Sequence, residues 1–140
     1  MPDEISARCT AIEECYEFML AYAGQGLSGG EGSQSSGQVR HYLERAVEAL
    51  SGLAAAYAAA VKQEKLQPPE ACQAFLAVME RDAQDSLAAI QLVLAQPTIS
   101  SQLIDNLNAS IHLRALLTDL FLIDEILKPQ RITAKPMTTG

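Results

Sequence analysis

The residues with the clearest capacity for chemistry are carboxylates and a histidine spread over three predicted helices. Glu13 and Glu17 lie one helical turn apart in the first, and Asp82 and Asp85 lie about one turn apart in the third. His41 stands near the start of the second. Carboxylate oxygens and imidazole nitrogens bind divalent cations. The pattern therefore allows a metal site made of these five residues, although acidic residues also occur on ordinary solvated helix faces.

The two histidines do not stand in the motif of carboxylate-bridged di-iron bundles. That motif places a glutamate three residues before each histidine. Here Gln38 stands three residues before His41, and Ala109 stands three residues before His112. The sequence therefore predicts no metal cofactor of that class, and no cofactor is assigned.

A segment rich in glycine and serine, residues 24–37, follows the first predicted helix. Its first six residues match the spacing G-x-G-x-x-G, but they follow a helix, whereas the dinucleotide motif must follow a strand. Hydroxyl groups and free N–H groups at the start of the next helix can still bind an anion. The candidate anion ligands are Ser33, Ser35, Ser36 and Arg40, and the alternative is a solvated loop.

The cysteines favour a reducing compartment and give no sign of catalysis. The chain has three, Cys9, Cys15 and Cys72, without a Cys-x-x-Cys motif. An odd number of unclustered cysteines argues against a disulfide framework. Cys9 and Cys72 fall in apolar helical stripes, where a thiol is unreactive. Together with an N-terminus that lacks a signal-peptide core, these features predict a cytoplasmic protein that is more consistent with a non-enzyme than with an enzyme.

Composition and charge narrow the fold and the partners. The chain has 140 residues and a net charge of −7, with 49% hydrophobic and 5% aromatic residues. Much of the apolar content is alanine and leucine, which favour helices over strands. Negative charge opposes binding to phosphate backbones and to anionic bilayers. We therefore expect an all-α protein that binds neither nucleic acid nor membranes.

Apolar residues recur every three or four positions along four long segments. In the first segment, Ile5, Ile12 and Met19 mark such a stripe. Short connections between the later segments predict antiparallel neighbours. The expected fold is an up-down-up-down four-helix bundle, a single domain over 1–128 with a flexible tail over 129–140. The four expected helices cover residues 4–23, 37–65, 69–95 and 99–128.

The second half of the last predicted helix is too apolar for one bundle core. Apolar residues there occupy most of the helix circumference, whereas one core needs a stripe of little more than 100°. A second apolar surface indicates self-association. Arg114 would then need an acidic partner from another chain. The predicted interface comprises Leu113, Arg114, Leu116, Leu117, Leu120, Phe121, Ile123 and Leu127.

These observations support one leading hypothesis and two alternatives. The leading hypothesis is a non-enzymatic helical-bundle protein that binds a protein partner or itself, most simply as a homodimer through the last helix. Such a protein would act as an accessory, assembly chaperone or regulator. The first alternative is a bundle, enzymes included, that binds a small molecule or metal through carboxylates and a histidine. The second is an anion sensor at the glycine-rich loop.

Overall fold

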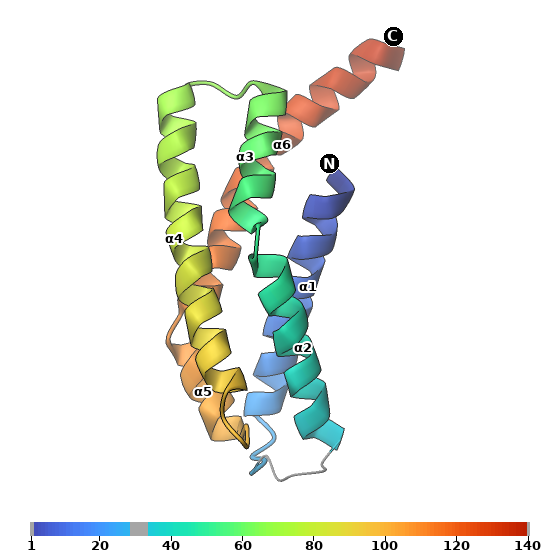
Figure 1. Cartoon of the computed structure of the whole chain (residues 1–140). Coiled ribbons are helices and arrows are strands. Elements are labelled where there is room, and N and C mark those ends of the chain that lie inside the picture. Colours follow the sequence, from blue (N-terminus) through green and yellow to red (C-terminus); the bar gives the residue numbers. More distant parts are fainter. Residues whose placement is uncertain (1, 29–33, 140) are drawn as a thin grey trace.

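The computed structural model consists of helices and connecting turns (Figure 1). It describes the backbone of residues 2–28 and 34–139, and side chains within 4–28 and 37–128. No strand occurs in these ranges, so the prediction of an all-α fold is confirmed. The helices are α1 (Pro2–Ala23), α2 (Gln34–Leu50), α3 (Leu53–Glu64), α4 (Pro69–Leu94), α5 (Ser101–Ala109) and α6 (His112–Thr139).

Two of the four expected helices are each divided in two, which accounts for the larger number of helices. The segment expected to be continuous over 37–65 breaks at Ser51 and Gly52, where Gly52 adopts a left-handed backbone with φ 88°. Glycine adopts this conformation without the steric cost that a side chain imposes. The segment 99–128 breaks at Ser110 and Ile111, and Ile111 has φ 62°. The prediction of two uninterrupted helices was therefore wrong.

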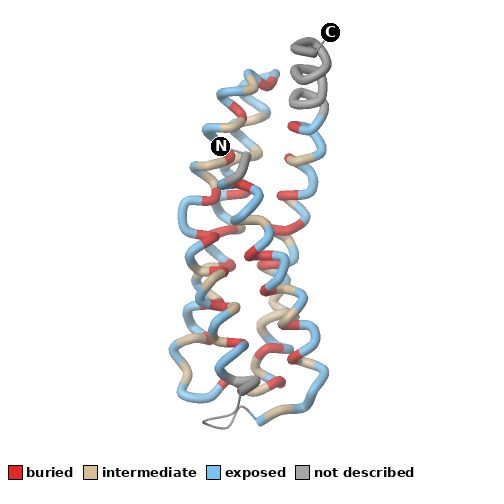
Figure 2. The backbone as a smooth tube through the Cα atoms, turned by 90° about the vertical axis from the view of Figure 1, so that its right-hand side faces the viewer, coloured by how far each residue is buried: buried red, intermediate tan, exposed pale blue. Residues whose placement is uncertain are grey.

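The helices run in two opposite directions along a common long axis. In Figure 1, α1 and α4 run downward, while α2 and α3 run upward in succession, as do α5 and α6. Figure 2 shows buried positions recurring along the helices. These positions form one hydrophobic core with members from every helix, among them Ile12, Leu43, Tyr57, Met79, Ile104 and Leu120.

The last helix extends past its expected end. It was predicted to stop near Lys128, but α6 continues to Thr139. The expected flexibility of residues 129–140 stays a prediction. Among the described residues, none of the helices is both long and apolar enough to cross a bilayer.

Two arginine side chains satisfy the carbonyl groups left open where helices end. Carbonyls in a final helical turn have no intrahelical partner, and a cation there also complements the helix dipole. Arg8 of α1 donates from Nη1 at 2.7 to 3.2 Å to carbonyls at the end of α2, those of Glu48, Ala49 and Ser51. Arg40 of α2 donates to carbonyls at the end of α4, those of Leu94, Gln96 and Pro97.

Replacing Arg8 tests whether this cap holds the break between α2 and α3. Arg8→Met keeps the aliphatic stem but removes the three contacts with carbonyls, together with the ion pair between Arg8 and Glu4. We expect the free energy of unfolding to fall by about 1–2 kcal/mol, because the acceptors are only partly shielded from water. Urea denaturation measures the change. Arg81→Met, at an exposed position of α4, is the matched control. An Arg8→Met protein no less stable than that control would contradict the assignment.

Candidate functional site

The interface residues predicted on the last helix divide into two groups in the structure. Six of them are buried in the chain's own core, because α6 packs against α4, α1, α3 and α5 over a broad arc. These six are Leu113, Leu116, Leu117, Leu120, Ile123 and Leu127. Only Arg114 and Phe121 of the predicted set are exposed. The surface that α6 offers to a partner is therefore smaller than the sequence suggested.

The open side of α6 forms a groove with α1. Two cavities of about 420 and 400 Å³ are lined by residues of these two helices and have Glu13 in common; together they are called the α1–α6 groove. The first is lined by Ile5, Ser6, Cys9, Thr10, Glu13, Asp124, Glu125 and Lys128. The second is lined by Glu13, Tyr16, Glu17, Arg114, Leu117, Thr118 and Phe121. Ile5 thus lies near Lys128, and Glu17 near Arg114, as expected for antiparallel helices.

A hydrogen-bonded chain of three side chains includes two residues that line the first cavity, Cys9 and Asp124. Tyr57 of α3 is fully buried, and its hydroxyl donates to Oδ1 of Asp124 at 2.8 Å. The Sγ atom of Cys9 lies 3.2 Å from the same hydroxyl oxygen. Since the single hydroxyl proton goes to Asp124, the Cys9 thiol is the donor to Tyr57. The network therefore ties α1, α3 and α6 together at one point.

This network keeps the thiol protonated at neutral pH. Burial raises the pKa of Cys9, the hydrogen bond between Cys9 and Tyr57 lowers it, and the negative charges of Asp124 and Glu13 raise it further, with a net increase. Burial is also the main cause of the raised pKa of the Tyr57 hydroxyl. A nucleophilic or redox-active cysteine needs a lowered pKa. The arrangement is therefore a structural network, in agreement with the unreactive thiol expected at Cys9.

The second cavity brings a cation, carboxylates and an exposed aromatic ring together. Glu13 and Glu17, considered from sequence as metal ligands, face this groove with Arg114. In the described part of the chain, no carboxylate oxygen lies within 4.0 Å of the Arg114 guanidinium group. Phe121 is 57% exposed beside it. These groups can form ion pairs and apolar contacts with an incoming chain.

The remaining metal candidates are not gathered into one group. His41 is exposed on α2 with its ring edge-on to Tyr42, and Asp85 is exposed on α4. Asp82 is half-buried on α4. Burial, and then the Asp82 carboxyl group, raise the pKa of Asp119 on α6. Within the ranges whose side chains are described, no three His, Cys, Asp or Glu residues are placed to hold a metal ion.

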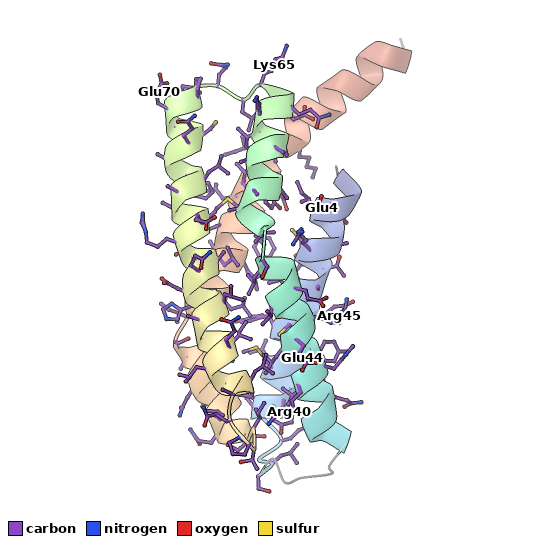
Figure 3. The ribbon with its side chains drawn as sticks, in the orientation of Figure 1. Glu4, Arg40, Glu44, Arg45, Lys65 and Glu70 are labelled. Carbon is purple, nitrogen blue, oxygen red and sulfur yellow. The ribbon has the colours of Figure 1, made fainter. Side chains whose placement is uncertain are left out.

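Of the four residues predicted to bind an anion, Arg40 is the one whose side chain the structure describes. Ser33 lies outside the described residues, as do the side chains of Ser35 and Ser36. Arg40 is seen at the lower end of the molecule (Figure 3), where its guanidinium group donates to the three carbonyls at the end of α4. Arg40 therefore acts as a helix cap.

Sequence reasoning did not identify Tyr57 as the partner of Asp124. The two hydrogen-bond partners of Tyr57 are 48 and 67 residues away in the sequence. An acidic residue on the buried side of an apolar helix was the available signal, because such a group needs a partner. Identifying that partner requires the rotation of each helix about its axis, which periodicity alone leaves open.

Removing the charge of Asp124 tests the electrostatic description of the thiol. Asp124→Asn keeps an oxygen acceptor for Tyr57 but removes a negative charge that raises the pKa of Cys9. We expect the alkylation of Cys9 at pH 8 to accelerate about two- to fivefold, because the thiolate fraction rises. Mass spectrometry after a timed iodoacetamide treatment measures the rate. Glu125→Gln is the matched control, and equal rates in the two variants would contradict the description.

Comparisons of this chain with protein-family models, with curated proteins and with solved structures find no match. The grounds for a function are therefore the side chains of the α1–α6 groove and the interactions that their chemistry allows.

Proposed function

We propose that this protein is a non-enzymatic helical-bundle protein that associates with a second copy of itself through the α1–α6 groove. The observation that carries the proposal is the exposed ring of Phe121 beside Arg114, which has no carboxylate partner in the described part of the chain. In this proposal α2 and α3 together occupy the position of one helix of an antiparallel four-helix bundle, and α5 and α6 together occupy the position of another. The free thiols of its cysteines support a reducing, cytoplasmic location.

Apolar side chains on the outer arc of α6 supply the driving force. Phe121, Leu122 and Ile126 are 57%, 51% and 48% exposed. Complete burial of a large apolar side chain contributes about 1.5–3 kcal/mol, and partial burial correspondingly less. Aromatic side chains are enriched among residues that dominate binding energy at interfaces. Phe121 is therefore the expected centre of the contact.

Charges at the groove favour a second copy over an unrelated partner. A two-fold interface uses the same surface on both chains, so that surface must be complementary to itself. The second cavity of the groove is lined by one cation, Arg114, together with the carboxylates of Glu13 and Glu17. Antiparallel docking of two such surfaces would set Arg114 of each chain against the carboxylates of the other. It would also seat Phe121 of each chain in the other's groove.

Replacing Phe121 tests the apolar part of the contact. We expect the wild-type chain to sediment as a dimer at high concentration, and Phe121→Ser to weaken the association at least about tenfold. Sedimentation velocity over a wide concentration range measures both. Leu92→Ser is the matched control, since Leu92 is 67% exposed on α4 and does not line the groove. A wild-type chain that stays monomeric throughout, or equal effects of the two substitutions, would contradict the proposal.

Charge reversal tests the polar part of the contact. Arg114→Glu and Glu17→Arg should each weaken self-association, because each places like charges against one another across the interface. Mixing the two variants should restore association, since the heterodimer has opposite charges at both of its contacts between positions 114 and 17. Fluorescence anisotropy with one labelled variant measures the mixing. If the mixture associates no better than either variant alone, the pairing is refuted.

A further inference from the structure

The C-terminal part of α6, residues 129–139, continues beyond the rest of the bundle. In Figure 1 the red end of α6 passes the first turn of α1 and the top of α3 and points away from the other helices. The backbone of residues 129–139 is helical, and a helix of this length extends about 16 Å. A projection of this length can reach the surface of a second chain.

This extension differs in charge from the chain as a whole. It contains Arg131 and Lys135 and no acidic residue, whereas the whole chain has a net charge of −7. Its sequence also contains the apolar residues Ile132 and Met137. A basic segment with apolar residues is complementary to a surface that offers carboxylates and exposed apolar side chains.

A two-fold pairing of antiparallel α6 helices determines which surface the extension meets. In a pairing centred on Phe121, residues at equal distances before and after Phe121 come level with one another. Ile111 and Arg131 each lie about 15 Å along the helix axis from Phe121. Lys135, at about 21 Å, then comes level with α5 of the second chain, because α5 precedes α6 and runs in the same direction.

The surface at that level carries an exposed apolar side chain and an exposed carboxylate. Ile111, in the break between α5 and α6, is 52% exposed on a left-handed backbone with φ 62°. Asp105 is exposed on α5. Among the described side chains, no cation lies within 4.0 Å of the Asp105 carboxylate group. An apolar and basic segment would therefore find both kinds of contact at this place.

We propose that residues 129–139 form an arm that packs on α5 and on the helix break at Ile111 of a second copy of the chain. In this arrangement Lys135 of one chain lies against Asp105 of the other. The inference rests on the proposed self-association through the α1–α6 groove. It adds two symmetric contacts outside that groove, because neither Ile111 nor Asp105 lines it.

Exchanging the charges of Lys135 and Asp105 tests the arm in the full-length chain. Lys135→Glu and Asp105→Lys should each weaken self-association about three- to tenfold at low ionic strength, because each sets like charges against one another at two symmetric contacts. The double variant Lys135→Glu/Asp105→Lys should recover the wild-type dissociation constant. The weakening in the single variants should shrink as salt is added, since exposed charges are screened. Sedimentation velocity measures each dissociation constant.

Matched controls separate this inference from the proposed function. Lys62→Glu and Asp85→Lys, at exposed positions of α3 and α4, should leave the dissociation constant unchanged. A wild-type chain that stays monomeric would overturn the proposed function and the arm with it. A dimer that Phe121→Ser disrupts, but that Lys135→Glu and Asp105→Lys affect no more than the controls do, would overturn the arm alone. Single variants that weaken association without recovery in the double variant would also overturn it.

Discussion

Six apolar side chains of α6 are buried against the other helices, and their burial fixes which side of α6 meets water. Every other interaction of α6 follows from that rotation. This rotation places Asp124 against the buried hydroxyl of Tyr57. Arg114 and Phe121 are left facing outward. One apolar contact surface thus determines the position of the three-residue network and of the exposed groove.

Polar groups within the fold are satisfied by side chains that join different helices. Arg8 and Arg40 each complete the end of a helix other than their own. Tyr57 joins Cys9 and Asp124 across three helices. Each of these contacts requires the helices to be correctly aligned with one another. A buried polar group that loses its hydrogen-bond partner destabilises the fold by more than one hydrogen bond stabilises it. At one end of the α1–α6 groove, Tyr57 links α1 and α6 through its bonds with Cys9 and Asp124. At the other end, near Arg114, no side-chain hydrogen bond joins the two helices among the described residues.

Periodicity in the sequence was sufficient to predict the helical class and much of the core. Ile5, Ile12 and Met19, assigned to one stripe, are all buried. The breaks were not predictable in the same way. Gly52 stands among strong helix formers, where an isolated glycine is usually tolerated, and nothing in its type marks Ile111 for a left-handed backbone. The sequence shows that apolar residues occupy most of the circumference of α6. It does not show how many of them the neighbouring helices bury, because that depends on how the helices pack.

The central claim is that Phe121 of one chain lies in the α1–α6 groove of another. An isotope-filtered NMR experiment on mixed labelled and unlabelled chains tests it most directly, because only contacts between different molecules give a signal. The account predicts cross-peaks from the Phe121 ring to Tyr16 and Leu117 of the second chain. A sample that sediments as a dimer but gives no such cross-peaks, or a sample that never dimerises, would contradict it.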